Sequence, residues 1–283
     1  MFWNILTLEH TKIFRRTMFW VELALAALLV VGLDIGLFAF FHLKPTANGQ
    51  ALPPEAVAQI KSSLVWPSAL LSTLILVGRT GLSTLLVITL VGAATAQDYT
   101  WRTMPLWLSR GASRPALLWA KFGALLLPTL LIVLVPLVAG AVPTALFSVQ
   151  MDGSLHLDQL DLGRLALGVL CLTLTLLPYA GLAFLLAIAT RSTVAVIGGG
   201  LAYTLIVENI LAQILSLFGG WPASVAQYLP GGLSNALLTL GQGGSQAASG
   251  GLPPEAAAIG LGLYTLLFCG LALLIFRRQD LTA

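Results

Sequence analysis

Charged residues are scarce in this sequence: Asp, Glu, Lys and Arg make up 9% of its 283 residues, whereas 58% are hydrophobic. This composition cannot supply the charged surface that keeps a globular protein in water. The net charge is only +3, and the basic residues lie between apolar runs rather than in one patch. A nucleic-acid-binding surface is therefore not expected.

Cysteine and histidine are also rare. Cys171 and Cys269 both fall inside apolar segments, where they are expected to act as small apolar side chains rather than as a disulfide or metal pair. The three histidines are scattered and no HExxH motif occurs, so no metal site is predicted. The sequence contains neither a GxxxxGK[ST] phosphate loop nor a GxSxG motif. We therefore expect no catalytic residues, no bound cofactor and no ATPase activity in the chain itself.

Long apolar runs are abundant. A helix needs roughly 20 apolar residues to cross a bilayer, and six segments qualify: 18–41, 80–96, 122–148, 164–189, 194–218 and 256–276. The sequence thus predicts an all-α membrane protein, with residues 1–283 forming a single six-span domain. Residues 66–78 are apolar too, and we interpret them as an outer surface or re-entrant helix that ends at Arg79. Alternatively, they extend the second span and bury Arg79 against an acid such as Asp34.

Charge placement predicts the orientation. Ten of the 14 Lys and Arg residues belong to the N-terminus, the 97–121 loop, the 190–193 turn or the C-terminus. The positive-inside rule places these parts, and so both termini, in the cytoplasm. Residues 1–16 favour an interfacial helix, although Glu9 and His10 interrupt its apolar side. Residues 219–255 are rich in Gly, Pro and Ser and favour an outer re-entrant segment.

The 97–121 loop is a dense polar island between two spans. It holds four basic residues: Arg102, Arg110, Arg114 and Lys121. Its composition predicts a short helix on the membrane surface, with Asp98 as a candidate N-cap and Gly111 as a candidate stop. The alternative is an ordinary cytosolic loop.

This loop resembles the first cytoplasmic loop of type-2 ABC exporter permeases. The matching positions are Asp98, Tyr99, Thr103, Arg110, Gly111, Ser113, Arg114 and Lys121. Two positions depart from the family pattern, since Asp98 stands where Glu is common and Arg102 where Gly is common. The resemblance implies that residues 97–114 are a coupling helix and residues 1–16 an elbow helix. It further implies a homodimer of permeases in a bacterial plasma membrane, with two cytoplasmic ATPase subunits that bind ATP and Mg. On physical grounds, we expect Arg102, Arg110 and Arg114 to meet acidic or polar groups on the ATPase surface.

Two polar positions lie deep in predicted spans. Glu208 and Asn209 fall near the middle of the fifth span, and Asp34 lies about two-thirds across the first. An ionised carboxylate at that depth costs at least ~2.5–3.5 kcal/mol, so it must be neutral, paired or in water. These residues could line a translocation path, or they could form structural hydrogen bonds between helices.

Three functions are compatible with these features. The first is an ATP-driven exporter subunit that moves an amphipathic peptide, lipid or drug. The second is a proton-coupled secondary transporter with Asp34 and Glu208 as relay acids. The third is a membrane-embedded enzyme or assembly factor.

Overall fold

A computed structural model describes residues 2–42, 46–47, 50–51, 53–79, 81–101, 103–109, 111–218, 220–241 and 252–279. Within these residues, six helical segments are long and apolar enough to cross a membrane. They are α2 (Thr17–His42), α5 (Leu82–Thr100), α7 (Arg114–Asp152), α8 (Leu162–Thr190), the segment Thr193–Phe218 and α13 (Pro254–Arg278). The chain is thus a multi-pass α-helical membrane protein. The strands β1 (Thr46–Ala47) and β2 (Gln50–Ala51) form a minimal antiparallel pair.

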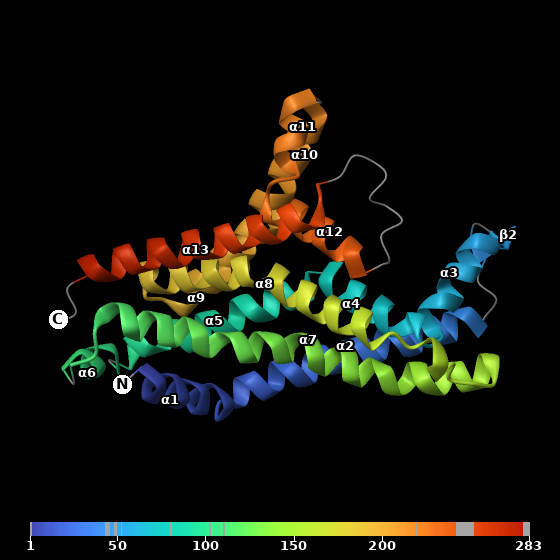
Figure 1. Ribbon diagram of the computed structural model, residues 1–283, viewed down its shortest axis with the longest axis horizontal. Coiled ribbons are helices and arrows are strands. Elements are labelled where there is room, and N and C mark those ends of the chain that lie inside the picture. Colours follow the sequence, from blue (N-terminus) through green and yellow to red (C-terminus); the bar gives the residue numbers. More distant parts are fainter. Residues whose placement is uncertain are drawn as a thin grey trace.

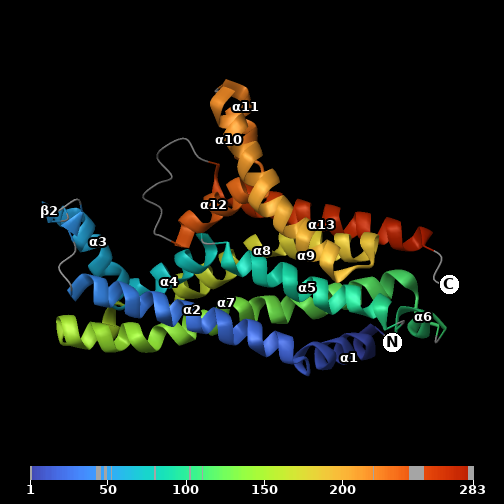
Figure 2. The same cartoon turned by 180° about the vertical axis from the view of Figure 1, so that it is seen from behind.

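The shorter elements lie at opposite ends of the bundle (Figures 1 and 2). The helices α1 (Phe2–Phe14) and α6 (Thr103–Ser109) lie at one end, together with the C-terminal end of α13. The helix α3 (Pro54–Leu64) and the strand pair lie at the other end. The even number of crossings agrees with both termini lying on one side.

Helix ends follow local chemistry. The Asp161 carboxylate accepts a hydrogen bond from the Arg164 amide, 3.0 Å away, and this caps the start of α8. The Ser192 hydroxyl caps the next helix, α9 (Thr193–Ala202), in the same way. In α9, a Cβ atom on Gly200 would lie only 2.6 Å from Ile88 of α5. The glycine therefore allows α5 and α9 to pack closely, as the Gly198–Gly200 run predicts.

The segment before the second span is a separate helix, α4 (Ser68–Arg79), packed against α7 and α8. Gly81 adopts φ +68° and separates α4 from α5, so the two do not form one continuous span. Leu70, Leu74 and Val77 are buried in the bundle. The segment is therefore neither an outer surface helix nor part of one unbroken span: α4 packs inside the bundle, and α5 continues beyond it toward α6 (Figure 1). The side chain of Arg79 lies outside the described residues.

The helix α6 is shorter than the predicted 97–114 segment. Asp98 and Tyr99 belong to α5, which continues to Thr100, and Arg114 is the first residue of α7. The reason is that Lys12 and Lys121 neutralise the charge of Asp98 inside the bundle. The helix of span two can therefore continue past Asp98 instead of ending before it.

The fifth span is interrupted. A π-helix, η2 (Tyr203–Glu208), follows α9 and leads into α10 (Asn209–Phe218), which has no buried residue. Figures 1 and 2 show α10 and α11 (Gly220–Ala226) projecting sideways from the bundle. The helix α12 (Pro230–Gly241) then returns to the bundle and packs on α8 and α13. The predicted 219–255 segment therefore contains two helices, and residues 242–251 lie outside the description.

Candidate functional site

Four charged side chains meet where α1, α5 and α7 come together near α6. We call Glu9, Lys12, Asp98 and Lys121 the charge quartet. Lys121 Nζ lies 2.6 Å from Glu9 Oε1 and also contacts Asp98 Oδ2. Lys12 Nζ contacts Asp98 Oδ1 and lies 3.6 Å from Glu9 Oε2. Each carboxylate therefore contacts both ammonium groups.

Glu9, Asp98 and Lys121 are buried, with Asp98 at 0% and Lys121 at 4% exposure, and the Lys12 side chain is 24% exposed. Isolated charges at such positions would be very unfavourable, but two anions and two cations sum to zero. Burial lowers the pKa of Lys12, and the nearby Lys121 lowers it further, while Asp98 and Glu9 oppose this shift. The quartet thus connects three helices through mutually dependent contacts.

The quartet adjoins the corner between α5 and α6. The hydroxyl of Thr103, the first residue of α6, donates to the carbonyl of Asp98 over 3.2 Å. Arg16, which connects α1 to α2, donates to the Ala93 carbonyl at 2.6 Å. Its guanidinium also lies 5.2 Å from the centre of the Trp101 ring. These contacts join the α5–α6 corner to the connection between α1 and α2.

A second set of contacts joins this corner to the end of α13. Arg114 Nη1 donates to the carbonyls of Phe276, Arg277 and Gln279 at 3.1, 2.7 and 3.1 Å. The Tyr99 hydroxyl donates to Gln279 Oε1 at 3.2 Å. These contacts satisfy carbonyls that a helix end leaves without partners.

The predicted coupling residues that the structure describes divide into two groups. Asp98, Tyr99, Arg114 and Lys121 make contacts within the bundle, as described above. Thr103 and Gly111 bound the α6 turn, where Gly111 has φ +82°, and Ser113 precedes α7 without capping it through its side chain. Arg102 and Arg110 lie outside the described residues.

Sequence reasoning missed Glu9 and Lys12 as members of this cluster. Ile5, Glu9 and Ile13 are spaced four residues apart and form the buried face of α1. The interruption of the apolar face by Glu9 was the available signal, since a carboxylate there requires a buried cation. The position of that cation, Lys121, follows only from the packing of α7 on α1.

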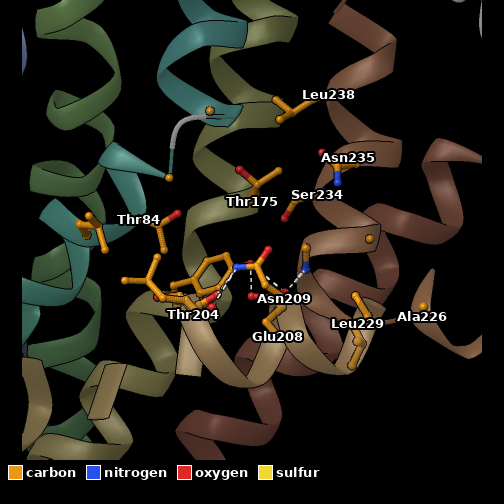
Figure 3. A pocket seen from close by; sticks show the side chains of 18 residues that line it. Thr84, Thr175, Thr204, Glu208, Asn209, Ala226, Leu229, Ser234, Asn235 and Leu238 are labelled. Atoms are coloured by element: carbon orange, nitrogen blue, oxygen red, sulfur yellow. Dashed lines mark hydrogen bonds between the residues drawn. The ribbon is translucent and has the colours of Figure 1, made fainter. Parts of the chain in front are cut away.

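A second candidate site is a polar cavity of about 350 Å³. It lies where the α4–α5 break, α8, η2, α10, α11 and α12 converge. Its polar lining consists of Thr84, Thr175, Tyr179, Thr204, Glu208, Asn209, Ser234 and Asn235. Figure 3 shows several of these side chains, from different helices, arranged around one space.

Glu208 is the one acidic side chain among the described residues that line this cavity. The Tyr179 hydroxyl donates to Glu208 Oε1 and Oε2 at 3.1 and 3.0 Å. The Gly231 amide, at the start of α12, donates to Glu208 Oε1. The carboxylate therefore links span five to α8 and to the first turn of α12, where the helix dipole favours negative charge.

The other two predicted path residues have different surroundings. Asn209 lines the cavity, and its Nδ2 donates to the Thr204 carbonyl at 2.8 Å. Asp34 is only 3% exposed and faces Gly140 of α7 and Thr73 of α4. Asp34 Oδ2 has no hydrogen-bond partner among the described residues. Glu208 and Asn209 thus share one site, and Asp34 does not line it.

Comparison with curated proteins gives no match. A family described as "Protein of unknown function (DUF2705)" matches residues 57–282. This range covers most of the chain and includes every candidate site element except α1 and α2. The chain belongs to the DUF2705 family.

Proposed function

We propose that this chain is the membrane-spanning permease subunit of an ATP-driven ABC exporter that moves an amphipathic substrate out of the cell. The subunit would act as a homodimer in the plasma membrane. Two separate cytoplasmic subunits would bind ATP and Mg and hydrolyse the ATP.

The observation that carries the proposal is the structure around α6. This short helix connects spans two and three at the end of the bundle that also holds eight described basic residues: Lys12, Arg15, Arg16, Arg114, Lys121, Arg191, Arg277 and Arg278. The charge quartet and the Arg16–Trp101 contact join its corner to α1, α5 and α7. A force applied to α6 by an ATPase subunit would therefore reach spans two and three directly. The polar cavity lies beside the opposite end of α5, at Thr84, so the same span connects α6 to the cavity.

The test is purification of the subunit in mild detergent from its native membrane, followed by identification of associated proteins. A roughly stoichiometric ATPase is expected with the wild-type chain. The Arg102→Glu/Arg110→Glu variant should lose about tenfold or more of this association, because reversed charges at an interface repel. Arg15→Glu is the matched control, since Arg15 is exposed at the same end of the bundle but lies outside the α6 loop.

A wild-type subunit that purifies alone would contradict the proposal. Equal retention of the ATPase by the α6 variant and the Arg15 control would contradict the role of Arg102 and Arg110. Arg114 is left unchanged because it also contacts the end of α13. Its replacement would disturb folding as well as docking, so a loss of the ATPase would have two explanations.

The buried Asp34 carboxylate favours the second candidate, a proton-coupled transporter. Such a protein would transport its substrate in vesicles that contain a pH gradient and no ATPase. Asp34→Asn would then abolish the gradient dependence, whereas an exporter would keep its ATP dependence.

A further inference from the structure

The polar cavity combines one carboxylate with a mostly neutral lining. Among its described lining residues, Glu208 is the one acidic side chain, and no Lys, Arg or His side chain is present. The remaining polar groups are hydroxyls and amides. Charge interactions are strong where water is partly excluded, so the carboxylate should dominate the selectivity of this cavity.

Glu208 retains capacity for another partner. A carboxylate offers about four acceptor positions on its two oxygens. Tyr179 supplies a single hydroxyl proton shared between the oxygens, and Gly231 supplies one amide proton to Oε1. Among the described residues, Oε2 therefore has an acceptor position left for a ligand, while the existing donors hold the carboxylate in place.

The cavity also has an apolar part. Leu85, Leu205, Leu229 and Leu238 line it beside the polar groups, together with Ala212. Its volume of about 350 Å³ lies within the range of small-molecule sites, roughly 300–1,000 Å³. A ligand that fits would place a charged group near Glu208 and an apolar group against the leucines.

We infer that the polar cavity binds the cationic ammonium group of an amphipathic substrate, with Glu208 as its counter-ion. This inference rests on the proposed transport function and narrows its substrate class to cationic amphiphiles. Thr204 and Asn209 line the cavity beside Glu208.

The test uses the full chain, purified from its membrane and reconstituted in lipid nanodiscs. The probe is benzylammonium, whose N–H groups can donate to the free acceptor position of Glu208. Its binding is measured by saturation-transfer NMR, with benzenesulfonate as an anionic probe of similar size. Saturable binding of the cation is expected, and benzenesulfonate should not compete. Glu208→Gln should weaken cation binding about tenfold or more, because the amide keeps an acceptor oxygen for Tyr179 but loses the charge.

Two variants complete the design. Glu255→Gln removes a carboxylate at the exposed start of α13 and should leave binding unchanged. Arg79→Gln removes the basic residue that follows the lining residue Gly78 in sequence, and it should leave cation binding unchanged or strengthen it. The unfolding midpoint of each variant establishes that it is folded.

The outcomes separate this inference from the proposed function. Equal binding of the cation by wild type and folded Glu208→Gln, or competition by benzenesulfonate, would overturn the inference even if an ATPase co-purifies. Cation binding that depends on Glu208 in a subunit without an ATPase would support the inference and contradict the exporter. Weaker cation binding by folded Arg79→Gln would also contradict the inference, because removal of a positive charge cannot weaken the attraction between a cation and Glu208.

Discussion

Asp98 is fully buried at the end of α5, and its two oxygens contact Lys12 and Lys121. Asp98→Asn should lower the free energy of unfolding by about 3–5 kcal/mol, because it leaves the buried Lys121 and the partly buried Lys12 with one carboxylate between them. Unfolding in detergent, followed by circular dichroism, measures the change. The double variant Asp98→Asn/Lys121→Met should lose less free energy of unfolding than the two single variants lose in total, since it removes one charge of each sign.

The matched control is the ion pair between Lys61 and Asp152. Lys61 Nζ lies 2.7 Å from Asp152 Oδ1, but both side chains are partly exposed. Lys61→Met should change the same free energy by less than about 1 kcal/mol. Similar losses of unfolding free energy for Asp98→Asn and Lys61→Met would mean that the quartet stabilises the fold no more than a partly exposed ion pair does.

Gly231 lies against Glu208, and a Cβ atom there would fall 2.7 Å from Glu208 Oε1. Gly231→Ala should therefore displace the carboxylate and cost roughly 1–3 kcal/mol of stability. It should also weaken binding of benzylammonium. Gly262→Ala on α13 is the control, because no atom lies within 4 Å of its Cβ position. If both alanine variants bind the cation like wild type, the position of Glu208 does not matter for binding.

At the scale of the element, Arg114 joins the start of α7 to the end of α13. Arg114→Ala should leave the carbonyls of Phe276, Arg277 and Gln279 without this donor. The loss of hydrogen bonds from a charged donor costs roughly 1.5–3 kcal/mol. Faster amide exchange in the last turn of α13 is the expected result, measured by mass spectrometry. Arg278→Ala, a change to an exposed arginine on the same turn, should leave exchange unchanged.

Apolar length in the sequence located the six spans, because hydropathy over about 20 residues is a local property. The interruption at Tyr203–Glu208 could not be predicted, since no proline marks it and the α10–α11 projection depends on how α12 packs. The predicted 97–114 helix was too long at both ends for a related reason. Asp98 looks like a helix cap in sequence, and only the distant Glu9, Lys12 and Lys121 make its burial possible.

The same limit applies to the polar cavity. The depth of Glu208 and Asn209 within an apolar run identified them as polar residues of interest. Their neighbours Tyr179 and Gly231 come from two other helices, 29 and 23 residues away from Glu208. Such pairings follow from the topology of the bundle, which a single sequence does not contain.

At the scale of the whole molecule, the distribution of charge predicts one orientation in the membrane. The end that carries α1, α6 and the end of α13 holds most of the basic residues, and the end that carries α3 holds few. The positive-inside rule places the first end in the cytoplasm. An ATPase can reach α6 only in that orientation.

Single cysteines test this orientation in intact cells. The background variant is Cys171→Ala/Cys269→Ala, which removes both buried thiols. A membrane-impermeant maleimide should label Ala58→Cys and Ser154→Cys, since these exposed positions lie in α3 and in the α7–α8 turn. Arg15→Cys and Arg277→Cys should be labelled only after the cells are permeabilised. The reverse pattern would place α6 outside the cell, where no ATP supply exists, and the ATP-driven mechanism would then be untenable, whereas the cation site at Glu208 would still stand.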